Sequence, residues 1–218
     1  WLNLTFITLN TIMAAGAGAT IIIILSVFMT ISSFYKGGHM TRTIVAAAST
    51  GYAFPGTMLS IGVLVFCGIF DDIYVYCINF FSNKPNTGLV SGTLFILLFS
   101  YVIRFQAVGY GAMRSGLNQV PSNLIDASLT MGKSFKESLF KVIFPLLKTS
   151  ILAGGLLAFV DIMKELPMTL LLRPFNFETL STYTYQFAHD ELIEQAALPA
   201  LLIILAGLLP VIFMNKFL

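Results

Sequence analysis

The sequence predicts an all-α fold, a polytopic membrane bundle of about five transmembrane helices. Among its 218 residues 57% are hydrophobic and only 10% are charged, a balance that water-soluble domains of this length do not show. The charges are also clustered, so long uncharged runs alternate with short polar segments. A hydrocarbon core of about 30 Å takes roughly 20 helical residues to cross, and lipid leaves the backbone of such a segment no hydrogen-bond partners outside the helix.

The uncharged runs define the spans. We place them at residues 10–34, 43–70, 88–103, from 149 onward, and 196–213. The second run is interrupted by Pro55-Gly56, which predicts a kink or a locally unwound turn. Asp71 and Asp72 close this run, and Arg104 closes the third.

One long polar loop, at about residues 113–148, separates the third span from the fourth. Asp126 soon after Pro121 is typical of a helix start, and Gly132 and Pro145 divide the rest, so we expect two short helices. The whole chain, residues 1–218, is predicted to be a single transmembrane domain that carries this loop.

The basic residues predict the orientation, because Lys and Arg are enriched in cytoplasmic loops near span ends. When the spans alternate, one side collects nine basic residues: Lys36, Arg42, Arg104, Arg114, Lys133, Lys136, Lys141, Lys148 and Lys216. The other side collects six acidic residues, Asp71, Asp72, Glu178, Asp190, Glu191 and Glu194, with Lys84 and Arg173. The bias predicts an amino end outside, the long loop in the cytoplasm and a carboxyl end inside.

Several function classes are disfavoured by composition and motifs. A net charge of +2 without a dense basic run argues against a nucleic-acid partner. Cys67 and Cys77 form no CxxC pair and have no histidine nearby, so neither a metal site nor a redox motif is indicated. The sequence contains no GxxxxGK[ST] nucleotide loop and no HExxH or GxSxG motif, so we predict no catalytic residues and no intramembrane enzyme.

The polar loop carries a spaced pattern: Asp126-Ala127-Ser128, three residues, Gly132, nine residues, and then residues 142–145, which end in Pro. It resembles the cytoplasmic motif of permease subunits of binding-protein-dependent ATP-binding cassette importers, which reads Glu-Ala-Ala, three residues, Gly, nine residues, Ile-x-Leu-Pro. The acid, the first Ala, the Gly and the Pro agree in kind and spacing. Ser128 replaces the second Ala.

This resemblance implies a type I importer permease fold, in which a short helix with small residues seats in a groove of the ATPase and transmits its closure. The implied coupling residues are Asp126, Ala127, Ser128, Gly132 and Pro145. The chain itself would bind no cofactor, since ATP and Mg belong to the partner ATPase dimer. The other implied partners are a second permease half or copy, an external substrate-binding protein and the lipid bilayer. A competing interpretation is an interfacial amphipathic helix whose lysines face anionic lipid.

Three further segments, residues 51–56, 159–167 and 171–175, are similar to the iron(III)-type permeases of the bacterial inner membrane. Thiamine, sulfate and phosphonate permeases share the fold. Iron-type permeases usually contain two such loops and this chain has one, so the resemblance implies one half of a tandem permease, the carboxyl-terminal half. The implied function is to pass ferric iron from the external binding protein into the cytoplasm.

Asp161, Lys164 and Glu165 are expected inside or at the edge of the membrane, where ionisable groups tend to face a cavity or to pair. Spacings of three and four residues would put them on one helical face. One lysine neutralises one acid, so the excess negative charge would suit a passing Fe³⁺ ion. The alternatives are a structural ion pair, an interfacial position, or a proton or ion relay in a secondary transporter.

A polar stretch at about residues 178–194 offers further candidate ligands for ferric iron: Tyr183, Tyr185, His189, Asp190 and Glu191. Their spacing is diagnostic of no metal site. A solvated amphipathic helix that helps to receive the binding protein explains them better.

Overall fold

A computed structural model describes residues 2–35, 38–81, 90–121 and 123–217, and within these ranges every regular element is a helix. The elements are α1 (Leu2–Tyr35), α2 (His39–Thr50), η1 (Gly51–Ala53), α3 (Gly56–Phe81), α4 (Leu94–Asn118), α5 (Asn123–Thr130), α6 (Phe135–Ser138), η2 (Leu139–Ile143), α7 (Phe144–Met163), α8 (Pro167–Leu172), α9 (Leu180–His189) and α10 (Ile193–Phe217). Lys36 and Lys84, which entered the orientation prediction, lie outside the described residues.

The predicted membrane bundle is confirmed. Four stretches of the described residues are long and apolar enough to cross a bilayer: Asn3–Ser33, Gly56–Asn79, Leu94–Asn118 and Phe135–Met163. A shorter apolar stretch, Ile193–Leu208, lies in α10. The expectation of about five spans agrees with these helices.

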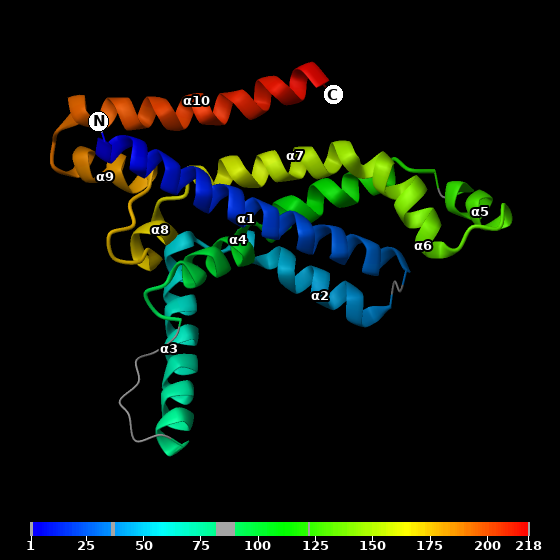
Figure 1. Cartoon of the computed structure of the whole chain (residues 1–218), viewed down its shortest axis with the longest axis horizontal. Coiled ribbons are helices and arrows are strands. Elements are labelled where there is room, and N and C mark those ends of the chain that lie inside the picture. Colours follow the sequence, from blue (N-terminus) through cyan, green and yellow to red (C-terminus); the bar gives the residue numbers. More distant parts are fainter. Residues whose placement is uncertain (1, 36–37, 82–89, 122, 218) are drawn as a thin grey trace.

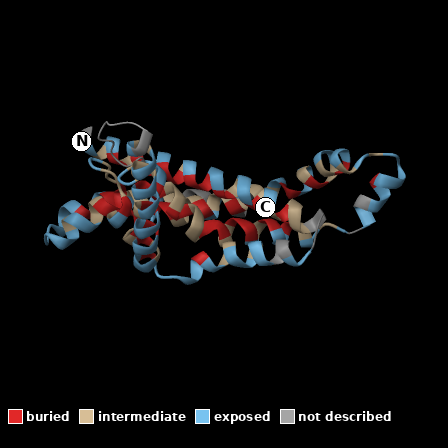
Figure 2. Cartoon of the chain, turned by 90° about the horizontal axis from the view of Figure 1, so that it is seen from below, coloured by how far each residue is buried: buried red, intermediate tan, exposed pale blue. Residues whose placement is uncertain are grey.

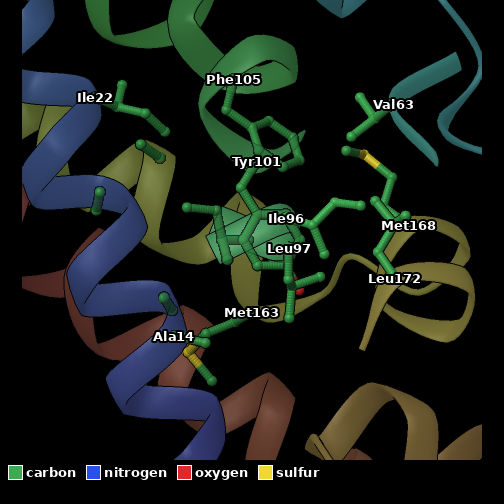
Figure 3. Packing of buried hydrophobic residues seen from close by; sticks show 14 of the residues in the cluster. Ala14, Ile22, Val63, Ile96, Leu97, Tyr101, Phe105, Met163, Met168 and Leu172 are labelled. Atoms are coloured by element: carbon green, nitrogen blue, oxygen red, sulfur yellow. The ribbon is translucent and has the colours of Figure 1, made fainter. Parts of the chain in front are cut away.

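The core of the bundle is the packing of α1, α4 and α7, which run along the long axis of the molecule with α10 beside them (Figure 1). Tyr101 and Leu97 of α4 and Met163 of α7 are almost fully buried in this core (Figure 3). Gly109 lets α1 and α4 approach, because a Cβ at this position would lie 2.6 Å from both Ile22 Cγ2 and Ser26 Oγ. Close contact through small residues is the usual way in which membrane helices associate.

The outward faces of the helices remain apolar and exposed (Figure 2). Phe28 of α1 is 71% exposed and Phe66 of α3 is 61% exposed, although both are large hydrophobic side chains. In water such faces would be unfavourable, whereas in a bilayer they contact lipid or another membrane subunit.

The prediction of one span over residues 43–70 is wrong. The run divides into α2, η1 and α3, and α3 leaves the bundle at a steep angle (Figure 1). The break falls at Pro55, as its kinking effect predicts. Asp71 and Asp72 do not close a span, because α3 continues to Phe81. The Asp71 carboxylate instead accepts hydrogen bonds from the backbone N–H groups of Val90 and Ser91, at 3.0 and 2.8 Å.

The expected limits of the third and fourth spans also need correction. Arg104 does not end the third span, because α4 extends to Asn118 and includes the first residues of the predicted polar loop. Arg104 therefore lies in the first half of α4, away from the end that leads to α5. The fourth span begins before residue 149, since α6, η2 and α7 follow one another without a break from Phe135. Both errors arise from treating a charged residue as a helix boundary.

Candidate functional site

Helix α5 lies beyond the ends of α4 and α7, at the far end of the molecule from α8 and α9 (Figure 1). It is eight residues long, with Asp126 in its first turn, where a negative charge favours the helix dipole. Asp126 and Ala127 are both exposed. The expected short helix is present, but only Ala127 of its two small residues is exposed, because Ser128 is buried.

Gly132 ends α5 in a way that favours glycine. Its φ of +82° lies in the left-handed region, where a Cβ is disfavoured. The Gly132 N–H donates to the Leu129 carbonyl at 3.0 Å, and the Lys133 N–H donates to the Ser128 carbonyl at 3.2 Å. These two hydrogen bonds form a Schellman motif, which satisfies the last carbonyls of a helix.

Helix α6 follows at once and is fixed to α5 by side chains. Ser134 and Glu137 form a capping box, in which each side chain accepts a hydrogen bond from the backbone N–H of the other residue. Ser128 of α5 is buried, and its hydroxyl donates to Ser138 Oγ of α6 at 2.5 Å. Ser138 donates in turn to the Ser134 carbonyl at 3.0 Å.

Pro145 lies at the start of α7, directly after the π-helical turn η2. Because proline has no N–H, a regular α-helix would leave the carbonyl four residues earlier without its partner. The turn is wider here, and the Phe144 N–H donates to the Leu139 carbonyl five residues back. The structure therefore separates Pro145 from the other four predicted coupling residues by α6 and η2.

The three ionisable residues predicted at membrane depth lie at the opposite end of α7. Asp161 is in the last turn of α7, and Lys164 caps that helix with its Nζ 2.7 Å from Asp161 Oδ1. The side chain of Lys164 is 62% exposed, so this pair reaches the surface of the isolated chain. Its hydrogen bond to Asp161 raises the pKa of Lys164.

Glu165 does not share their helical face, because α7 ends at Met163 and Glu165 lies in the turn before α8. It is buried, and its Oε2 lies 3.7 Å from Arg104 Nε. Burial is the largest influence on the Glu165 carboxyl and raises its pKa, while Arg104 opposes that shift. The Met168 N–H also donates to Glu165 Oε1 at 3.3 Å.

Arg104 is the residue that sequence reasoning missed. It was assigned to the cytoplasmic group of basic residues, whereas the structure places it beside the turn that joins α7 to α8. Its Nη1 donates to the Phe54 carbonyl at 3.5 Å, and a Cβ on Gly56 would lie 2.5 Å from this nitrogen. Arg104 and Glu165 thus lie at the start of α3. With Arg104 present, the charged cluster has two acids and two bases, so its formal charge is zero.

The stretch between α8 and α10 carries another ion pair, between Arg173 and Glu178. In α9 the rings of Tyr185 and His189 stack with centroids 5.8 Å apart. Among the described residues no three His, Cys, Asp or Glu side chains come together as a metal site would require. The preference for a polar helix over an iron site at this position remains a prediction.

Comparison with known proteins adds the family. The profile of the family described as "Binding-protein-dependent transport system inner membrane component" matches residues 22–218. A ferric transport system permease protein FbpB of Actinobacillus pleuropneumoniae is 23% identical over 182 residues, which are 84% of this chain and 24% of that protein. An Fe(3+)-transport system permease protein FbpB 2 of Haemophilus influenzae is 20% identical over 209 residues, 95% of this chain and 38% of that protein. The chain thus spans well under half the length of these relatives.

Two solved structures share the fold. One is a bacterial ABC transporter involved in the import of the acidic polysaccharide alginate, with a TM-score of 0.72 at 14% identity, covering 96% of this chain and 77% of the other. The second is the MetNI methionine ABC transporter in an inward-facing conformation, with a TM-score of 0.64 at 14% identity, covering 95% and 90%. These comparisons confirm the expected importer-permease fold, and the family match over residues 22–218 shows that the chain belongs to the binding-protein-dependent transport system inner membrane components.

Proposed function

We propose that this chain forms part of the channel of an ATP-driven importer and that α5 is the helix on which the partner ATPase docks. The observation that carries this proposal is the placement of α5. It stands exposed between two spanning helices, α4 and α7, with the small residue Ala127 on its surface and Gly132 turning the chain at its end. A small exposed side chain allows close approach of a partner surface. The turn at Gly132 fixes the direction of α5, so that a movement of the ATPase would be transmitted through α5 to α7.

The proposed cargo is ferric iron, delivered by an external binding protein. The support is the similarity to two ferric permeases, at 23% and 20% identity. Because the chain spans only 24% and 38% of those relatives, a second permease half or a second copy is proposed to complete the channel. The proposed orientation has the amino end outside and α5 in the cytoplasm.

Asp161, Lys164 and Glu165 remain candidates for the translocation pathway. Asp161 and Lys164 reach the surface of the isolated chain, which is what a channel-lining position requires. The geometry also gives strong support to the structural alternative, since each acid has a cationic partner within 4 Å. In that case the cluster holds α4, α7 and the start of α3 together and is not a binding site for a passing cation.

The test is site-directed crosslinking of a cysteine at Ala127 to the co-expressed ATPase, in membranes with and without ATP. The native Cys67 and Cys77 are first replaced by Ala. Gln186→Cys on α9, exposed at the other end of the chain, is the matched control. We expect a nucleotide-sensitive crosslink at Ala127 and none at Gln186. Uptake that continues without the ATPase and collapses with the ion gradient would instead establish the secondary transporter.

A further inference from the structure

The segment that contains α5, α6 and η2, residues 123–143, is the proposed coupling loop. A hydrogen-bonded chain of serine hydroxyl groups links its helices α5 and α6. Ser128 is 2% exposed and Ser138 is 1% exposed, so the bond between them is shielded from water. Both residues lie in a segment that is otherwise largely exposed. Ser138 passes the chain on to the Ser134 carbonyl, which belongs to the cap of α6. Ser138, the last residue of α6, is therefore hydrogen-bonded both to the N-cap residue of its own helix and to α5.

A helix as short as α5 needs tertiary contacts to hold it in place. Helix α5 has only eight residues, and isolated helices shorter than about 12 residues are marginal in water. Helix α6, by contrast, is the first turn of the continuous helical stretch Phe135–Met163. The position of α5 against α6 therefore depends on tertiary contacts, and one of them is the hydrogen bond between the buried side chains of Ser128 and Ser138. A hydrogen bond protected from water also resists exchange with solvent partners.

The junction between α6 and α7, by contrast, has a disrupted backbone hydrogen-bond pattern. The π-helical turn Leu139–Ile143 and Pro145 replace the regular hydrogen-bond ladder of an α-helix at this point. A π-turn and a proline are both recognised causes of a helix kink. In Figure 1 the ribbon bends where α6 passes into α7. Helix α6 is thus hydrogen-bonded to α5 through Ser128 and Ser138, whereas its connection to α7 lacks the regular backbone hydrogen bonds of an α-helix.

We propose that Ser128 and Ser138 form a latch that joins α5 and α6 into one rigid coupling unit, and that this unit turns against α7 at the π-turn. Ser128 is then a positioning residue: it acts through Ser138 on the direction in which α6 meets α7. This proposal rests on the proposed importer function for its role in transport, although the latch itself is a property of the chain alone.

The first arm of the test measures the latch without any ATPase. Spin labels are attached at Thr130→Cys of α5 and Lys136→Cys of α6, both exposed, in a background lacking Cys67 and Cys77. We expect one narrow distance distribution in the parent chain. One intramolecular hydrogen bond changes a population ratio roughly 2- to 12-fold.

The Ser→Ala variants then remove the bond. S128A and S138A should each add a second distance population. The double variant should add no more than S138A alone, because S138A already removes the bond that S128A removes, together with its own bond to the Ser134 carbonyl. S115A, at an exposed serine of α4, is the matched control and should leave the distribution narrow. Distributions that stay narrow in S128A and S138A would overturn the latch, and so would additive broadening in the double variant.

The second arm uses the complex with the ATPase and adds a label pair across the π-turn, at Lys136→Cys and Lys148→Cys. ATP should shift this distance and leave the distance from Thr130 to Lys136 unchanged. S128A should keep ATP hydrolysis while transport per ATP falls roughly 2- to 12-fold. A nucleotide-dependent change between Thr130 and Lys136 would overturn the rigid unit. Loss of the nucleotide effect together with loss of the Ala127 crosslink would refute the importer function and leave the latch standing.

Discussion

Replacing Gly132 tests whether the turn after α5 is required for coupling. The φ of +82° at this glycine lies in the region that costs other residues about 1–2 kcal/mol. A Cβ added at Gly132 would meet no heavy atom within 4 Å, so the cost arises from the backbone and not from a clash. Gly132→Val is the strongest test, because a β-branched residue is least suited to this conformation.

A cost of this size lowers the ratio of correctly turned to unturned loops roughly 5- to 30-fold. Because no neighbour is displaced, we expect the Gly132→Val protein to insert in the membrane and to be as abundant as the parent. The assay is ATP hydrolysis and substrate uptake by the reconstituted complex, expressed as substrate moved per ATP. This ratio should fall, while hydrolysis persists.

Gly132→Asn is the matched control, since asparagine tolerates the left-handed region far better than valine. It should keep most of the transport per ATP. The reasoning is refuted if the valine variant couples normally, because the turn would then be dispensable. It is also refuted if asparagine is as harmful as valine, because the defect would then not come from backbone strain.

Three further predictions concern the bundle. Gly109→Val should lower the melting temperature in detergent, because overpacking typically costs 1–3 kcal/mol, while Gly111→Val, which meets no neighbour, should not; equal effects would contradict the packing argument. Asp71→Ala should speed amide exchange in the two residues whose N–H groups it accepts, by about 10-fold or more in hydrogen-exchange mass spectrometry, and an unchanged rate would show that other contacts hold them. Arg104→Met should make the melting temperature fall more steeply as pH rises above about 4.3, the ordinary Glu value. The buried Glu165 carboxyl already has a raised pKa, and the substitution removes the cation that favours its ionised form, so its pKa in the folded protein rises further. Stability is then lost over the wider pH range between the Glu pKa of the unfolded chain and that of the folded protein. A pH profile like that of the parent would contradict this.

The apolar spans and the short helices of the polar loop could be predicted from the sequence because both depend on local patterns. Uncharged runs of sufficient length define helices in lipid whatever their neighbours are. Gly132 could be predicted because the residue type itself reports the backbone conformation. Ser128 was predicted only as a coupling residue, and its burial against Ser138 was not foreseen, since no local pattern reports which side of an eight-residue helix is covered.

The charged cluster could not be predicted, because its partners come from distant parts of the chain. The side chains of Arg104 and Glu165 are 61 residues apart in sequence and belong to different elements. Spacing rules compare residues within one helix, so they paired Glu165 with its near neighbours. Arg104 was assigned to the cytoplasmic side because it ends an uncharged run. The path of α3 was missed for a related reason: composition shows that residues 56–79 are apolar, but only tertiary contacts decide their direction.

Helix α7 joins the proposed coupling loop to the charged cluster, because it contains both Pro145 and Asp161. Pro145 and Asp161 are 16 residues apart on α7, which is about 24 Å along a helix axis. If the unit of α5 and α6 rotates at the start of α7, this one helix would therefore transmit the movement to its other end, which carries Asp161. There the neighbouring pair of Glu165 and Arg104 contacts α8 and the start of α3. A substitution in the π-turn should thus alter the labelling rate of a cysteine placed at Lys164. A substitution in the charged cluster of Arg104, Asp161 and Glu165 should leave the distance between labels at Thr130 and Lys136 unaffected.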